Sequence, residues 1–124
     1  MNKFVFLLIM LSILLSSTAQ IVLKMGMSNP IVLHAINASS TFNIVRTIAT
    51  NLYVVGGLTL YFSSAAVWLF VLAKIDVSTA YPFVGIGFIL TMLLAFTING
   101  EAMTAAKVAG TLLIAAGVVV IARG

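Results

Sequence analysis

The sequence predicts an all-α integral membrane protein, a bundle of four transmembrane helices. Of its 124 residues, 63% are hydrophobic and only 6% are charged, whereas about a quarter of the residues in a soluble domain are charged. A chain this short cannot bury so much apolar surface in one soluble core. Because one spanning helix needs about 20 apolar residues, four spans use nearly the whole chain. Residues 1–124 are therefore treated as one membrane domain, without room for a soluble catalytic domain.

The first span is predicted over 3–24, because no charged residue lies between Lys3 and Lys24. The segment from Ser17 to Gln20 also has the small residues of a secretory cleavage site, which makes a cleaved signal peptide the alternative. The apolar run resumes directly afterwards, over 21–23. We therefore favour an intact N-terminal helix.

The later spans are predicted over 42–73, 78–98 and 104–122. Their apolar runs are continuous and do not alternate in polarity as the strands of a membrane β-barrel do. The second begins early because Phe42, Val45 and Leu52 recur at helical spacing, which we interpret as an interfacial start before the bilayer, with a bend available at Gly56–Gly57. Turn formers or charges separate the spans, at Ser28-Asn29-Pro30, Lys74-Ile75-Asp76 and Asn99-Gly100-Glu101.

The charges are dispersed, although the formal net charge is +4. Single bases beside apolar runs exclude the basic patch that nucleic-acid binding needs. Four spans place three bases on each side of the membrane: Lys3, Lys74 and Arg123 against Lys24, Arg46 and Lys107. The positive-inside rule then gives no orientation. Either the chain inserts both ways, so that two opposed copies form an antiparallel dimer, or a dominant base or a partner fixes one orientation.

Cysteine is absent, which removes disulfides, thiolate chemistry and cysteine-based metal sites. The sequence contains no set of metal ligands and no nucleophile–base pair that would assemble an enzyme's site. We therefore predict no metal, no cofactor and no enzymatic activity.

A polar stripe follows the first predicted helix. Ser12, Ser16, Gln20 and Lys24 are spaced four apart and share one face, and polar groups in a span face the bundle interior or a water-filled cavity. An amide one turn from an ammonium suits a phosphate. The alternative for Lys24 is that it extends to the interface, and Ser12 is expected to serve helix packing or bond locally.

Three aromatic residues join the candidate site. Tyr61 and Trp68 lie with Ser64 on one face of the second helix, where they would line a groove for a sugar or a lipid chain; for Trp68 an interface anchor is the alternative. Tyr81 opens the third helix beside Pro82, which a first turn tolerates. Its hydroxyl would lie near the boundary, as an anchor or a ligand contact.

Glu101 is the acid beside the last helix. It would act as a coupling acid or cation contact, or remain a solvated acid at a helix N-terminus, and we favour the second interpretation. No Asp, Glu or His lies within a predicted span, so no residue is a candidate for a buried carboxylate that couples transport to protons. In the last helix, Ala106, Gly110 and Gly117 place small residues along one side, suited to dimer packing or to contacts within one subunit.

The last predicted helix carries a family resemblance. Gly100-Glu101 followed by Gly110, Leu113-Ile114 and Gly117-Val118 resembles the closing helix of the drug/metabolite transporter superfamily, which includes EamA-like and small multidrug resistance proteins. The resemblance implies a dimer of small multidrug resistance type in the bacterial inner membrane. Proteins of the multidrug branch use a glutamate in the first helix to export cationic compounds. Ser16 stands at the corresponding position here.

The sequence is more similar to the paired subunits that flip aminoarabinose-phosphoundecaprenol. The matching motifs are Gln20-x-x-x-Lys24, Trp68-Leu69-x-x-Leu72 and Ala80-Tyr81-Pro82. This resemblance implies a flippase for an undecaprenyl-phosphate glycolipid, working as a homodimer or with a similar small subunit. Lys24 and Gln20 would bind the phosphate, and Ser16, Tyr61, Ser64, Trp68 and Tyr81 would line the sugar's path. The alternatives are a small multidrug, cation or metabolite exporter, and a non-transporting subunit of a glycosyltransferase system.

Overall fold

The computed structural model describes residues 2–38 and 40–123, and every regular element in these residues is helical. In chain order the elements are α1 (Lys3–Met27), α2 (Pro30–Ala38), α3 (Thr41–Ala49), α4 (Leu52–Lys74), α5 (Val77–Ala80), the 3₁₀ turn η1 (Tyr81–Phe83), α6 (Val84–Ile98) and α7 (Ala105–Arg123).

Three helical segments are long and apolar enough to cross a bilayer: Lys3–Met27, Leu52–Lys74 and Val77–Ile98, of 25, 23 and 22 residues. A shorter apolar stretch, Ala105–Ile121, forms most of α7. The chain is therefore an all-helical, multi-pass membrane protein. That α7 forms a fourth crossing remains a prediction.

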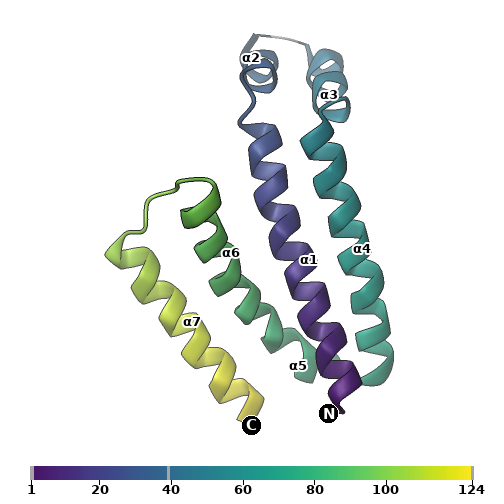
Figure 1. The fold of residues 1–124 in the computed structure, drawn as a ribbon, viewed down its shortest axis with the longest axis vertical. Helices are drawn as coiled ribbons and strands as arrows, with labels where there is room; N and C mark the ends of the chain where they lie inside the picture. The colour runs from purple at the N-terminus through teal and green to yellow at the C-terminus, as the bar shows by residue number, and fades with distance from the viewer. Residues whose placement is uncertain (1, 39, 124) are drawn as a thin grey trace.

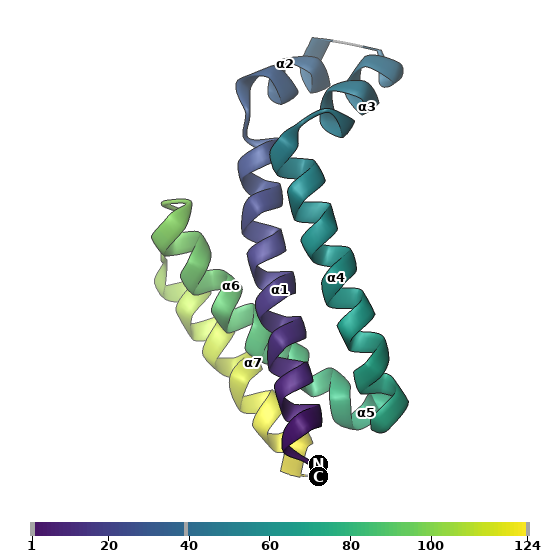
Figure 2. The same ribbon diagram turned by 45° about the vertical axis from the view of Figure 1, so that its right-hand side comes forward.

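α1 occupies the middle of the molecule (Figure 1). α4 packs along one side of it, α6 along another, and α7 lies beyond α6 (Figures 1 and 2). Successive long helices run in opposite directions, and α2 and α3 cap the end away from the start of α1 (Figure 2). α6 and α7 are thereby held to the rest of the chain mainly through α1.

The α1–α4 contact is the most extensive in the structure, and two glycines allow it. A Cβ on Gly57 would lie 2.7 Å from Leu23 Cγ and 3.1 Å from the Leu23 backbone nitrogen. A Cβ on Gly26 would lie 2.8 Å from Val54 Cγ2. Small residues let helix backbones approach closely where lipid supplies no hydrophobic drive for association.

Asn51 divides the segment that the sequence predicts as one helix, 42–73. Its side-chain oxygen accepts hydrogen bonds from the Tyr53 and Val54 backbone N–H groups, at 3.0 and 3.2 Å, which caps α4. Its amide nitrogen donates to the Gly26 carbonyl, 3.2 Å away, which joins the cap to the end of α1. The break therefore falls before the cap, and α4 continues through Gly56–Gly57.

α2 begins at Pro30, where the sequence predicts only a turn, Ser28-Asn29-Pro30. Asn29 accepts a hydrogen bond from the Ile31 backbone N–H, at 2.9 Å, and Pro30 occupies the first helical position. Proline is favoured there, since its missing N–H would have no helical partner.

Pro82 interrupts the third predicted helix, 78–98. The segment starts earlier, at Val77, and passes through the tighter turn η1 before α6 begins. Because proline lacks a backbone N–H, it fits this short 3₁₀ turn better than an uninterrupted helix.

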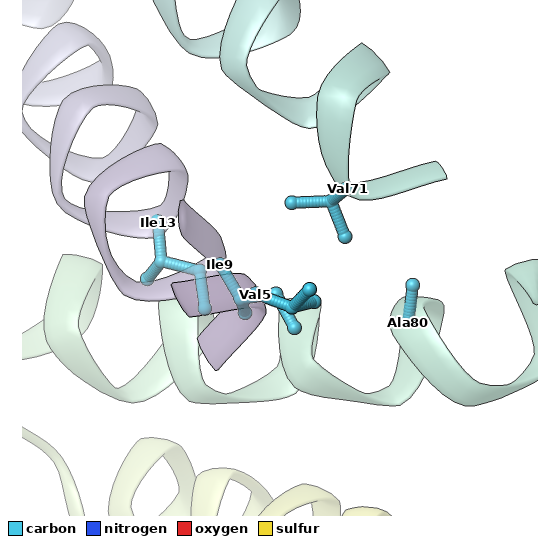
Figure 3. Packing of buried hydrophobic residues seen from close by; sticks show 5 residues of the cluster. All are labelled: Val5, Ile9, Ile13, Val71 and Ala80. Carbon is cyan, nitrogen blue, oxygen red and sulfur yellow. The ribbon is translucent and has the colours of Figure 1, made fainter. Parts of the chain in front are cut away.

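The buried core is small and lies toward the start of α1. Val5, Ile9 and Ile13 from α1 pack with Val71 from α4 and Ala80 from α5 (Figure 3). The Phe6 and Phe83 rings meet edge to face beside it, with centroids 6.4 Å apart. Most other large apolar side chains are exposed, as expected where lipid replaces water.

Replacing Gly57 by Ala should lower the free energy of unfolding by about 1–3 kcal/mol relative to Gly56→Ala, because overpacking forces the helices apart. Gly56 is the matched control, since nothing lies within 4 Å of its added Cβ. Thermal unfolding in detergent measures the difference. Equal stabilities of the two variants would contradict the packing described for α1 and α4.

Candidate functional site

A groove of about 720 Å³ lies between α1, α4, α6 and the loop that precedes α7. Its volume is within the usual range of small-molecule sites. Six of the seven predicted binding residues line it: Ser16, Gln20, Tyr61, Ser64, Trp68 and Tyr81. Residues 65 positions apart in the sequence are thus brought to one site, as Ser16 and Tyr81 show.

Ser12 and Ser64, which both line the groove, form a reciprocal hydrogen-bonded pair. The Ser12 hydroxyl donates to the Ser64 carbonyl at 3.0 Å, and the Ser64 hydroxyl donates to the Ser12 carbonyl at 2.8 Å. Both residues are buried. The pair ties α1 to α4, so the Ser64 hydroxyl already has a partner before any ligand arrives.

The other two serines of this wall are also engaged. Ser16 donates to the Ile13 carbonyl of its own helix, at 3.1 Å, and Ser17 donates across to the Gly87 carbonyl of α6, at 3.4 Å. Gln20 and the Tyr61 and Tyr81 hydroxyls have no such bonds among the described residues, and all three are exposed. They are the polar groups most available to a ligand.

The two charges at the groove, Glu101 and Lys107, come from the loop before α7 and from its first turn. The Lys107 ammonium donates to the Ala102 carbonyl at 3.1 Å, and its backbone N–H donates to the Thr104 hydroxyl at 3.2 Å. Glu101 is half-buried and precedes the helix by several residues. The interpretation as a solvated helix-terminal acid therefore does not describe its position.

Lys107 was missed by the sequence reasoning, although a signal was present. A cation in the first turn of a helix opposes the macrodipole, and such a misplaced charge points to a role other than local helix stability. Its place on the groove becomes visible only when α7 packs beside α6.

Lys24 does not line the groove. It is exposed in the last turn of α1, one turn beyond Gln20. The predicted pairing of Lys24 with Gln20 thus joins a residue of the groove to a residue outside it.

The small residues of α7 do not pack closely against another helix in the described part of the chain. There, no atom outside the adjacent backbone of α7 lies within 4 Å of a Cβ added to Gly110 or Gly117, and Ala106 is exposed. The close approach of α6 to α7 occurs instead at Gly85, where a Cβ would clash with Val118. Packing within one subunit therefore does not explain these residues, and dimer packing remains a prediction.

In the range 2–38 and 40–123, no group of three His, Cys, Asp or Glu side chains is placed to hold a metal ion. The polar side-chain groups on the groove are the Gln20 amide, the Trp68 indole N–H, several hydroxyls and one pair of opposite charges. Such groups can bind a sugar and a charged head group without bond-making chemistry.

No protein family model and no solved structure matches the chain. Two curated proteins match part of it, both named "Probable 4-amino-4-deoxy-L-arabinose-phosphoundecaprenol flippase subunit ArnE". The protein from Pseudomonas paraeruginosa is 38% identical over 58 residues, which is 47% of this chain and 50% of that protein. The one from Pseudomonas aeruginosa is 39% identical over 56 residues, which is 45% of this chain and 49% of that protein.

The chain is similar to these flippase subunits. It spans about half the length of the curated relatives that it matches. The predicted closeness to the aminoarabinose flippase subunits is thereby confirmed at the level of sequence similarity.

Replacing either Ser12 or Ser64 by Ala should lower the free energy of unfolding by about 0.6 kcal/mol, the usual value for a hydrogen bond between membrane helices, because each hydroxyl donates to the backbone carbonyl of the other residue. Thermal unfolding in detergent measures the loss. Ser16→Ala is the control, because its bond stays within one helix. Losses for Ser12→Ala and Ser64→Ala no larger than the loss for Ser16→Ala would contradict the reciprocal pair.

Proposed function

We propose that this protein is a subunit of a flippase that moves a polyprenyl-phosphate-linked sugar across the bacterial inner membrane. The observation that carries the proposal is the groove, which gathers six of the seven binding residues that the sequence predicts. The similarity to proteins named as flippase subunits, which are transporters rather than enzymes, supports it.

The groove supplies hydrogen-bond partners for the hydroxyl groups of a sugar, which lipid chains cannot do. A hydroxyl in hydrocarbon without a hydrogen-bond partner costs several kcal/mol, and Gln20, Tyr61 and Tyr81 have polar groups that are free among the described residues. Trp68 adds an apolar ring on which a sugar face can stack. The prenyl chain stays in the surrounding lipid, beside the exposed apolar side chains of α4 and α6.

The phosphate is assigned to Lys24. This side chain is exposed at the end of α1, one turn beyond Gln20, so a phosphate bound to it would hold the attached sugar close to the groove. An ammonium binds phosphate through charge-assisted hydrogen bonds. Gln20 then bridges the phosphate position and the sugar position.

The working unit is a dimer, formed with a second copy or with a similar small subunit. The open side of α7 at Ala106, Gly110 and Gly117 fits close helix contact. The equal number of bases at the two ends of the bundle permits an antiparallel pair.

A second candidate function, export of a small organic cation, is favoured by one observation: the Glu101 carboxylate lines the groove. Susceptibility of cells to cationic drugs, with and without the protein, separates the two. Unchanged susceptibility supports the flippase, and protection against cations supports the exporter.

Replacing Lys24 by Ala should slow flipping about tenfold or more, because a hydrogen bond to a charged group contributes about 1.5–3 kcal/mol. Lys24→Arg should retain most of the rate. The assay follows a polyprenyl-phosphate amino sugar in proteoliposomes, through the access of an amine reagent that cannot cross the membrane.

Lys74→Ala is the matched control, since Lys74 is equally exposed in the last turn of α4, at the opposite end of the bundle. It should flip at the normal rate. A normal rate in Lys24→Ala, with the protein correctly inserted, would remove Lys24 from the phosphate site.

A further inference from the structure

We infer that Glu101 is the residue that recognises a positive charge on the transported sugar: its carboxylate binds an ammonium group there and makes the groove prefer a charged head group to a neutral one. The inference rests on the proposed flippase function and adds a specificity-determining residue to it. Four features of the structure carry it.

The first is the placement of the two acids. The sequence contains two acidic residues, Asp76 and Glu101. Within the described part of the chain, Glu101 lines the groove and is half-buried, whereas Asp76 is exposed at the N-cap of α5 and does not reach the groove. The groove's negative charge therefore has a single source.

The second is that the loop holding Glu101 is fixed on both sides. Gly100 has a φ of +67°, a conformation that glycine adopts without strain, and it turns the Glu101 backbone N–H onto the Ala95 carbonyl at 3.1 Å. The Lys107 ammonium holds the Ala102 carbonyl on the other side. A carboxylate on a fixed loop loses little conformational entropy when it binds.

The third is that the carboxylate itself has no partner. Among residues 2–38 and 40–123, it accepts no hydrogen bond and forms no ion pair, even with the nearby Lys107. A partly desolvated carboxylate is stabilised by an arriving cation. The ammonium of an amino sugar supplies a charge-assisted hydrogen bond at that point.

The fourth is the opposite sign of the second charge. Lys107 lines the same groove, so a purely cationic ligand meets repulsion beside the attraction of Glu101. An amino sugar joined to phosphate is a zwitterion, so the negative charge of its phosphate offsets this repulsion. The loop between α6 and α7, which contains Glu101, and the last turn of α1, which contains Lys24, both lie toward the end of the bundle that carries α2 and α3 (Figure 1).

Trp68 makes the inference measurable, because it is the chain's single tryptophan and lines the groove. Its fluorescence is titrated with two probes in detergent: a polyprenyl phosphate carrying 4-amino-4-deoxy-L-arabinose, and the N-acetyl derivative, which lacks the positive charge. The unaltered protein should bind the amine about tenfold more tightly, the effect of one charge-assisted hydrogen bond.

Glu101→Gln should bind both probes with the affinity that the unaltered protein has for the N-acetyl form. Its fold should persist, because only the backbone of Glu101 is hydrogen-bonded in the described structure, and an unchanged unfolding temperature checks this. Asp76→Asn is the matched control and should keep the tenfold preference.

Equal binding of the two probes by the unaltered protein, or a preference that survives in Glu101→Gln, would overturn the role of Glu101 and leave the flippase proposal standing. Loss of the preference for the amine probe in Asp76→Asn would also overturn the role of Glu101, since the protein's net charge would then be the cause of that preference. Binding of neither probe would overturn the flippase proposal itself.

Discussion

The close contact between α1 and α4 is the interaction on which the rest of the structure depends. Gly26 and Gly57 let the two backbones approach, and the Ser12–Ser64 pair and the Asn51 bond to Gly26 lock them together. These few contacts stabilise the pair in a bilayer, where lipid is as apolar as the side chains and association depends on packing and hydrogen bonds.

This contact also decides which polar groups remain for a ligand. With α4 holding one side of α1, the groove opens between them and α6. The serines of its wall satisfy backbone carbonyls, while Gln20, the tyrosines and Glu101 stay uncommitted among the described residues. Because an unsatisfied polar group is costly in a membrane, the proposed function assigns these uncommitted groups to the substrate.

The sequence predicted the membrane class and the long helices, and six of its seven predicted binding residues line the groove, since apolar length and four-residue spacing are local signals. It missed α2 and the break at Asn51, although Asn29-Pro30 and Asn51 are capping signals that local reasoning can recognise. Lys107 on the groove and Lys24 outside it were beyond such reasoning. Both depend on how α6 packs against α1 and α7 packs against α6, which no local spacing encodes.

The central claim is that the groove holds a lipid-linked sugar in an assembly of small subunits. Native mass spectrometry of the protein, released from its own membrane in mild detergent, tests it most directly. The account predicts a dimeric species that retains a mass matching a polyprenyl-phosphate sugar. A monomer without bound lipid, from the same gentle extraction, would contradict it.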